Sequence, residues 1–193
     1  MEKYALEESK LIIKDEEIRI DIEEDFFLPS FGKKYNECDV VVKRDKKVKE
    51  VFFEKDNKKF GEKIVLYENG VIASSCFYLY DELHGPSTFY SKDKKILSIT
   101  WFYKGKREGK SKRYYSSGKI YCIERYKDNL MEGEQKYLYE NGRCRSMIYY
   151  KKGILCKKAL LYWDNGNIKR EVDFEEGRDN IYDEEGSLIY EKK

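Results

Sequence analysis

The sequence is poor in the residue types on which most enzyme sites depend. It has one histidine, His84, and none of its five cysteines is spaced as a CxxC pair. Histidine is the side chain that most often titrates near neutral pH, and zinc sites or disulfide frameworks need regularly spaced ligands. We therefore expect no catalytic residue, no metal and no cofactor, and we predict that the protein is not an enzyme.

Long hydrophobic runs are also missing. No run approaches the roughly 18 apolar residues of a membrane span, and residues 1–10 lack the apolar core of a secretory signal. We expect a cytoplasmic protein with reduced, partly buried cysteines, and export by a non-classical signal stays open. The two prolines and the lack of a convincing helical pattern favour a chain of paired strands.

Charged and aromatic side chains, by contrast, are abundant. Charged residues make up 39% of the chain, hydrophobic residues 40% and aromatic residues 16%. A disordered chain lacks so many aromatic residues, so we expect a folded protein with a thin core. The net charge of +2 hides an asymmetry, because residues 1–30 carry −6, 31–60 carry +4, 61–160 carry +9 and 161–193 carry −5. A basic middle between acidic ends indicates either a binding surface or a solubility pattern.

Glycine recurs with a period of 24 residues. Eleven of the thirteen glycines fall on three phases. The series are Gly61, Gly85, Gly109 and Gly133; Gly70, Gly118, Gly142 and Gly166; and Gly105, Gly153 and Gly177. Lys94 stands at the missing step of the second series, and Asp81 and Asn129 at those of the third. Because Asn and Asp are the best substitutes for glycine at positive φ, these phases predict turns.

Apolar residues keep the same period. The series are Leu66, Tyr90, Tyr114, Leu138 and Tyr162; Ile72, Ile96, Ile120, Cys144 and Ile168; and Tyr78, Phe102, Tyr126, Tyr150 and Phe174. Each unit therefore predicts two short strands, roughly 62–67 and 71–78, joined by a turn at 68–70 that contains Asn-Gly, a strong hairpin signal. We expect Ile72, Ser74 and Tyr78 to share one face, because even spacing keeps residues on one side of a strand.

The repeats predict an all-β fold, an elongated array of stacked antiparallel β-hairpins. Residues 40–53 read as a degenerate earlier hairpin, and residues 11–22 as a hairpin outside the repeat pattern. Tyr182 and Leu188 keep the six-residue spacing of Leu66 and Ile72 but arrive four residues early. We therefore predict an N-terminal cap at 1–36, hairpin repeats at 37–178 and a shortened repeat or cap at 179–193, since the ends of an array must be covered.

The phased glycines and aromatics resemble the MORN-repeat superfamily, and most of all the variant repeat of YwqK-type antitoxin proteins in bacteria. The best matches are Gly109–Ile120, Gly133–Gly142 and Tyr162–Ile168, and the similarity covers residues 61–178 well and 37–60 weakly. The resemblance implies hairpins stacked into an extended sheet. It also implies scaffolds that bind proteins, associate with membranes or act as antitoxin and immunity partners, and it carries no catalytic residues.

The densest basic and aromatic segment is 101–115. Trp101 opens it, and its cationic residues are Lys104, Lys106, Arg107, Lys110, Lys112 and Arg113. Such a segment can bind an acidic protein face, an anionic headgroup or a nucleic-acid backbone. The alternative is a solvated turn, because Phe102 and Tyr114 occupy core phases and lysines commonly surround a turn glycine. Among these partners, nucleic acid is not expected.

A second candidate site is an aromatic row at one phase of the repeat. It consists of Tyr67, Tyr115, Tyr139 and Trp163, with Ser91 interrupting it. These residues alternate with the Leu66 series, so in a single-layer sheet they would be exposed and stacked, as interface anchors are. The alternative is that their rings shield the second face of a thin sheet while the hydroxyls stay wet.

The remaining polar residues suggest structural roles. His84 precedes Gly85 at a repeat junction and is expected in a turn, Ser74, Ser98 and Ser146 are expected as small core spacers, and the acidic segment 171–185 is expected to be solvated. The function predicted from the sequence is a non-enzymatic scaffold that binds another protein, such as an antitoxin, immunity or effector protein. The alternative is a module that binds anionic phospholipid membranes through the basic central repeats. A dimer formed through sheet edges stays open.

Overall fold

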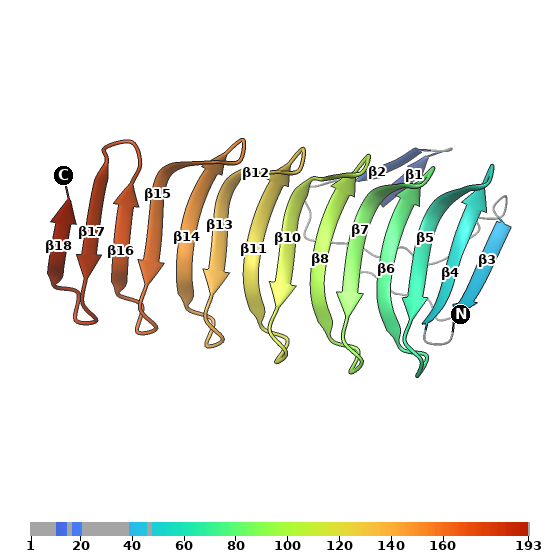
Figure 1. Ribbon diagram of the computed structural model, residues 1–193, viewed down its shortest axis with the longest axis horizontal. Coiled ribbons are helices and arrows are strands. Elements are labelled where there is room, and N and C mark those ends of the chain that lie inside the picture. Colours follow the sequence, from blue (N-terminus) through green and yellow to red (C-terminus); the bar gives the residue numbers. More distant parts are fainter. Residues whose placement is uncertain (1–10, 15–16, 21–38, 46–47, 193) are drawn as a thin grey trace. The chain divides into compact units, whose positions relative to one another are not determined.

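A computed structural model describes residues 11–14, 17–20, 39–45 and 48–192, and every regular element in these ranges is a β-strand (Figure 1). The predicted all-β class of consecutive antiparallel hairpins is confirmed. The chain divides into two compact units, Met1–Lys110 and Ser111–Lys193, which are described in turn.

Unit 1 contains one separate hairpin and a sheet in sequence order. The separate hairpin pairs β1 (Leu11–Lys14) with β2 (Glu17–Ile20), as expected within residues 11–22, of which 15, 16, 21 and 22 lie outside the described residues. The sheet runs through β3 (Asp39–Asp45), β4 (Val48–Lys55), β5 (Lys58–Leu66), β6 (Ile72–Leu79), β7 (Glu82–Tyr90) and β8 (Ile96–Tyr103), with β9 (Lys106–Arg107) paired to β8. The predicted degenerate hairpin at 40–53 is therefore present as β3 and β4.

Unit 2 continues the same pattern. Its strands are β10 (Gly109–Tyr114), which begins just before the unit boundary, β11 (Ile120–Lys127), β12 (Leu130–Met131), β13 (Gly133–Leu138), β14 (Cys144–Lys151), β15 (Ile154–Tyr162), β16 (Ile168–Asp173), β17 (Arg178–Tyr182) and β18 (Leu188–Lys192). Short β12 pairs with β11 beside the main path. Strands β17 and β18 form the last hairpin, which pairs Tyr182 with Leu188 as the shortened final repeat requires.

The phases assigned to glycine are turn positions even where glycine is absent. Lys94 has φ 63°, and Asp81 and Asn129 have φ 71° and 69°. Lys157, one period after Gly133, also has a positive φ, of 54°. The residue before Asp81, Tyr80, has φ 50°, and two successive positive values are the signature of the tight type I′ turns that fit the twist of paired strands.

The turn within each repeat is a different type, and it changes which residues share a face. Gly70 N donates to Tyr67 O at 2.9 Å and Tyr67 N donates to Val71 O at 2.8 Å, with positive φ at Gly70, as in a type I turn followed by a bulge. The register then pairs Leu66 with Ile72 but Val65 with Ser74.

The predicted common face of Ile72, Ser74 and Tyr78 is therefore wrong. Pairing partners lie on the same face of a sheet, and Val65 and Leu66 are adjacent, so Ile72 lies on the face opposite to Ser74 and Tyr78. One inserted residue is enough to reverse the alternation. We call the face of Leu66 and Ile72 face A, and the face of Val65 and Ser74 face B.

The largest buried side chains differ between the two units. In unit 1 the side chains of Phe77, Ile99 and Trp101, on face A, are at most 3% exposed. Unit 1 also buries Phe52, which pairs with Lys63 on face B and is 1% exposed. In unit 2 the most buried side chains include Cys122, Glu124, Tyr126 and Gln135, on face B. At the phases of Ser74 and Tyr78, which the sequence marks as core, Ser74, Cys122 and Tyr126 are buried, whereas Phe174 is 41% exposed.

Candidate functional site

The aromatic row is a set of hydrogen-bonded links between successive repeats. In unit 1, the Tyr67 hydroxyl donates to Tyr90 O at 2.8 Å. In unit 2, the Tyr115 hydroxyl donates to Leu138 O and the Tyr139 hydroxyl donates to Tyr162 O, both at 2.7 Å. Trp163 Nε1 donates to Tyr182 O at 3.2 Å, which places Tyr182 in the role of Tyr162 one repeat later.

These contacts differ from the exposed stack that the sequence predicted. The four aromatic side chains are half-buried, and each polar tip is bound to a carbonyl instead of water. A ring that covers the sheet while its hydroxyl bonds to the backbone stabilises the junction of two repeats. The row therefore has a structural role, and part of each ring stays accessible beside it.

Cations lie against the aromatic rings of unit 2. The Arg145 guanidinium lies 5.1 Å from the Tyr121 ring centroid and donates to the Tyr121 hydroxyl at 3.0 Å. Lys169 Nζ, one period later, lies 4.0 Å from the Trp163 ring centroid. Tyr121 also meets Tyr115 edge-on, with centroids 5.2 Å apart. Tyr121, Arg145 and Lys169 lie 24 residues apart, a spacing in the sequence that could have identified them as candidates.

The first part of the basic segment lies in unit 1. Trp101 is only 3% exposed, so its ring belongs to the core and is not accessible to a partner. Lys104 and Lys106 are exposed in the turn after β8, and Lys104 Nζ lies 5.5 Å from the ring centroid of the exposed Tyr103. Arg107 and Lys110 are half-buried. These cations form a charged turn and strand end.

His84 lies in strand β7 and is fully buried, so the prediction of a turn residue is wrong. Its Nδ1 accepts a hydrogen bond from Lys104 N at 3.3 Å, and its ring packs 5.0 Å from that of Tyr103. The adjacent Gly85, with φ 127°, lets the strand bulge and turn His84 inward. The imidazole thus holds the basic turn instead of facing a substrate.

The second part of the basic segment, Lys112 and Arg113, lies in unit 2. Arg113 Nη2 lies 2.6 Å from Glu124 Oε1, and this buried carboxylate also accepts hydrogen bonds from Tyr137 and Tyr126 at 2.9 and 3.1 Å. The carboxylate and burial together raise the pKa of the Tyr137 hydroxyl, with desolvation the larger cause. Arg113 is therefore engaged in an internal network, while Lys112 is half-buried on face A.

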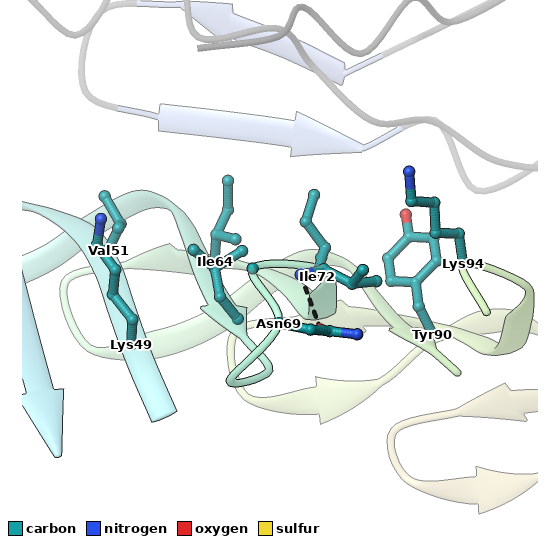
Figure 2. Close-up of a pocket in the computed structure, with 10 residues that line it drawn as sticks. Lys49, Val51, Ile64, Asn69, Ile72, Tyr90 and Lys94 are labelled. Carbon is teal, nitrogen blue, oxygen red and sulfur yellow. Dashed lines mark hydrogen bonds between the residues drawn. The ribbon is translucent and has the colours of Figure 1, made fainter. Parts of the chain in front are cut away.

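A pocket of about 630 Å³ opens on face A of unit 1 (Figure 2). Its wall is aliphatic, with Tyr90 at one side, and the turn residues Asn69, Gly70 and Val71 close it at another; the aliphatic residues are Val51, Ile64, Leu66 and Ile72. Lys49 and Lys94 contribute cationic chains to the rim. An apolar pocket with few polar groups at its edge is the usual form of a binding site. Sequence reasoning missed it because the bulge, which the pattern did not reveal, brings Leu66 and Ile72 together with Ile64.

A second surface lies at the turn edge of unit 2, and we call it the tip patch. Its apolar members are Leu130 and Ile154, which are 47% and 72% exposed and pair with Lys127 and Lys151 in the register. Gly153 N donates to Met131 O at 2.9 Å, which holds the tips of successive hairpins together. Its cationic members are exposed lysines, Lys127, Lys151, Lys152 and Lys157. Large exposed aliphatic side chains beside lysines indicate an interaction surface.

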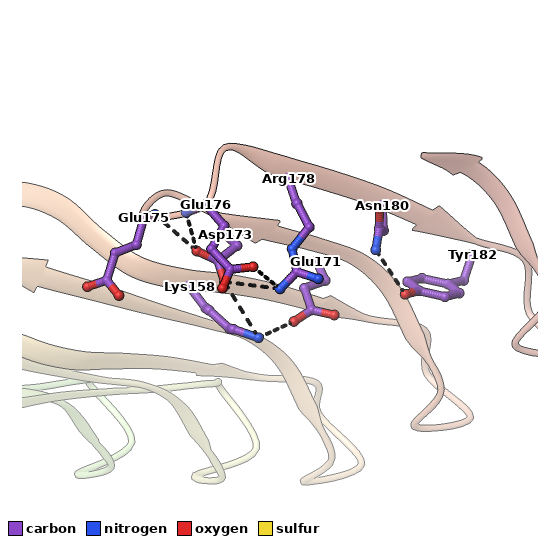
Figure 3. Close-up of polar contacts among 8 residues, drawn as sticks. All are labelled: Lys158, Glu171, Asp173, Glu175, Glu176, Arg178, Asn180 and Tyr182. Carbon is purple, nitrogen blue, oxygen red and sulfur yellow. Dashed lines mark hydrogen bonds and ion pairs between the residues drawn. The ribbon is translucent and has the colours of Figure 1, made fainter. Parts of the chain in front are cut away.

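The acidic C-terminal segment is less solvated than predicted, because several of its carboxylates pair with cations (Figure 3). Lys158 Nζ lies 2.7 Å from Glu171 Oε1 and 3.7 Å from Asp173 Oδ2. Arg178 pairs with Asp173 and Glu176, and Asp173 Oδ1 accepts two backbone hydrogen bonds at 3.0 Å. Those backbone donors lower the pKa of Asp173, with the nearby cations adding to the effect. The network stabilises the end of β16.

Two further observations concern metal ions and membrane spans. Among the residues that the structure describes, no three His, Cys, Asp or Glu side chains are grouped so that they could hold a metal ion. Within the same residues, no helix has the length and hydropathy needed to cross a membrane.

Comparison with known families identifies the repeat. Residues 107–128 and 155–176 match the MORN repeat variant. The first matched segment begins at the end of unit 1 and continues into unit 2, and the second lies within unit 2. Both agree with the resemblance of the phased glycines and aromatics. No curated protein matches the chain. Repeats of this type generally form non-enzymatic scaffolds that bind proteins or lipids.

Proposed function

We propose that this chain, which contains MORN-variant repeats, is a non-enzymatic scaffold whose unit 1 pocket binds a protein partner. The observation that carries the proposal is the aliphatic pocket with two lysines at its rim. The partner that fits it is a segment with aliphatic side chains beside acidic ones, because burying the former releases water and the latter complement Lys49 and Lys94. An antitoxin, immunity or effector protein would use such a surface.

The pocket is favoured over the aromatic row and the basic segment for physical reasons. Trp101 is buried, Arg113 is paired with Glu124, and the tyrosine hydroxyls of the row are bound to backbone carbonyls. Interface energy concentrates where a side chain fills a concave apolar site and excludes water. In the described part of unit 1, the pocket offers such a site, and the turn lysines would add charge steering around it.

The test compares capture by wild type and by a pocket variant. Ile72→Asp places a carboxylate in the aliphatic wall, and Ile189→Asp makes the same change at a residue of β18 that is 64% exposed. Full-length proteins are used as bait in cytosol from the source cells, with quantitative mass spectrometry as the readout. We expect a protein that wild type and Ile189→Asp retain and that Ile72→Asp loses by at least about tenfold, since a buried unpaired charge is costly. Equal retention by all three contradicts the proposal.

The tip patch supports a second candidate function, binding to anionic membranes. Exposed leucine and isoleucine side chains at hairpin tips can enter the interfacial region, while the four lysines meet lipid phosphates. This combination lies in unit 2, away from the pocket residues in the sequence, so the two functions are testable separately.

Flotation with vesicles decides the second candidate. The probe is a vesicle of phosphatidylcholine with about one-third phosphatidylserine at physiological salt, where the attraction of each lysine is modest. We expect wild type to float and the double variant Leu130→Ser/Ile154→Ser to remain in solution, while Leu188→Ser, which changes an exposed leucine elsewhere, floats like wild type. Absence of flotation by wild type contradicts membrane binding.

A further inference from the structure

The β1–β2 hairpin has one side that needs a covering surface. The register pairs Leu11 with Ile20 and Ile13 with Ile18, so four aliphatic residues share one side of the two-strand ribbon. The other side pairs Ile12 with Arg19 and Lys14 with Glu17. A two-stranded hairpin is marginal in water unless such an apolar side packs against another surface.

The unit 1 pocket has the complementary chemistry. It presents aliphatic side chains from β4, β5 and β6 and the ring of Tyr90 from β7, and β2 lies against β7 within the same unit. The eight paired hairpin residues carry Lys14, Arg19 and Glu17, and residues 15–16 and 21–25, which join and follow the two strands, add six acidic residues, opposite in sign to Lys49 and Lys94 of the pocket rim. Apolar matching and opposite charge therefore favour the same docking.

We propose that the β1–β2 hairpin binds the unit 1 pocket in the resting protein, as an internal occupant that a partner must displace. The docked side is that of Leu11, Ile13, Ile18 and Ile20. Displacement of the hairpin by a partner rests on the proposed function, whereas docking of the hairpin does not. A segment of the same chain needs little affinity to fill the pocket, because its tether gives it a high effective concentration. Only a partner that binds the pocket more tightly than the tethered hairpin does would then displace it.

The test measures how fast trypsin cuts the full-length protein after Arg19. Cleavage requires the hairpin to leave its surface, so the rate follows the population of the released state. We expect Ile13→Glu, on the apolar side, to raise this rate by about tenfold, and the matched change Ile12→Glu, on the opposite side, to leave it within about twofold. Mass spectrometry of the fragments identifies the cut.

Variants of the pocket separate loss of docking from damage to the hairpin itself. Ile72→Asp leaves residues 1–38 unchanged and should also raise cleavage after Arg19, whereas Leu97→Asp, at a side chain of unit 1 that is 39% exposed, should not. The charge reversal Lys49→Glu/Lys94→Glu should act like Ile72→Asp, and Lys58→Glu, at another exposed lysine of unit 1, should not. Slow cleavage in both pocket variants would overturn the docking, even if Ile13→Glu cuts quickly.

Displacement of the hairpin by a partner is tested by a separate measurement. With the partner found by capture, Ile13→Glu should bind it more tightly than wild type, because the competing hairpin is gone. Equal affinities would overturn the displacement while leaving the docking result intact. If no partner is captured, the proposed function fails, and the trypsin experiment still decides whether the hairpin docks.

Discussion

At the scale of the residue, the most unusual side chain is the carboxyl of Glu62. It is 1% exposed on face A of unit 1, where Ser75 donates a short hydrogen bond to Oε1. Among the described residues, Glu62 Oε2 has no hydrogen-bond partner. Desolvation by burial raises the pKa of Glu62 to about 7, and the Ser75 hydroxyl offsets only part of that effect.

Glu62 predicts a stability that falls as the pH rises. Its pKa in the folded protein lies above the ordinary value of 4.5, so the folded state binds the proton more tightly than the unfolded state. The stabilisation from this proton is fully present below pH 4.5 and is lost as the pH rises through about 7, a change of up to roughly 3 kcal/mol. Glu62→Gln should therefore be more stable than wild type at pH 8 and close to it at pH 5.

Urea unfolding at the two pH values measures this difference, with the exposed Glu68→Gln as the control. A Glu62→Gln effect of the same size at both pH values would contradict a titrating carboxyl.

The hydroxyl of Tyr139 gives a second prediction at this scale. Tyr139→Phe keeps the ring but leaves Tyr162 O without its donor at 2.7 Å. We expect a loss of about 1 kcal/mol in the free energy of unfolding, the net value of one hydrogen bond. Tyr190→Phe, at a ring that is 48% exposed on β18, should cost much less. Thermal unfolding compares the two, and equal losses would mean that the Tyr139 bond adds nothing to the repeat junction.

At the scale of the element, the turns determine the register and therefore the faces. The register shifts between Val65 and Leu66, and the same shift recurs between Tyr137 and Leu138 and between Leu161 and Tyr162. The positive φ of Gly70 allows this turn without strain, whereas Lys94 adopts φ 63° at the same phase with a side chain. A strained residue is therefore tolerated at this turn position, because the pairing of the strands on either side of the turn fixes the backbone.

Relief of that strain should stabilise unit 1. Lys94→Gly should raise the free energy of unfolding by about 0.5–1 kcal/mol, because glycine adopts positive φ without a steric cost. Lys92→Gly, in the same turn but without positive φ, should lower it, because glycine there only adds freedom to the unfolded chain. Chemical denaturation measures both variants, and a loss of stability in Lys94→Gly would show that its side chain contributes more than the strain removes.

At the scale of the whole molecule, the long strands of each unit follow one another in the sheet in chain order, with β1–β2 as a separate hairpin. Repeat arrays spread stability over local interfaces, so a defect should act mainly on the repeats beside it. The division of the chain into two compact units, each with buried side chains of its own, fits this independence.

A defect at Gly85 tests how local the stability is. A Cβ there would lie 2.8 Å from Phe77 Cβ, and φ is 127°, so Gly85→Ala is strained in two ways. We expect faster amide hydrogen exchange in β6–β8, and unchanged exchange in β14–β18. Gly118→Ala, with positive φ but open space around the glycine, should have a smaller effect on its own repeat. Equal acceleration throughout the chain would instead show one cooperative unit.

Particular residues show how far sequence reasoning reaches. The 24-residue period predicted the hairpins, the turn phases of Asp81, Lys94 and Asn129, and the shortened last repeat, because these depend on local backbone preferences. The 24-residue period did not predict the pocket or the buried position of His84. The pocket depends on how Leu66 and Ile72 meet across a bulge, and the buried position of His84 depends on another bulge at Gly85.

The sequence by itself determined that this protein is a series of β-hairpin repeats, since strand alternation and turn chemistry act between near neighbours in the chain. Only the tertiary structure decided which side chains of each repeat are buried, that the tyrosine row bonds to the backbone one repeat later, and that an aliphatic pocket forms beside two lysines. The physical reason is that a single extra residue in a strand reverses the side to which every following residue belongs. Register, and with it the binding surface, is therefore fixed by pairing between strands and not by the pattern within one of them.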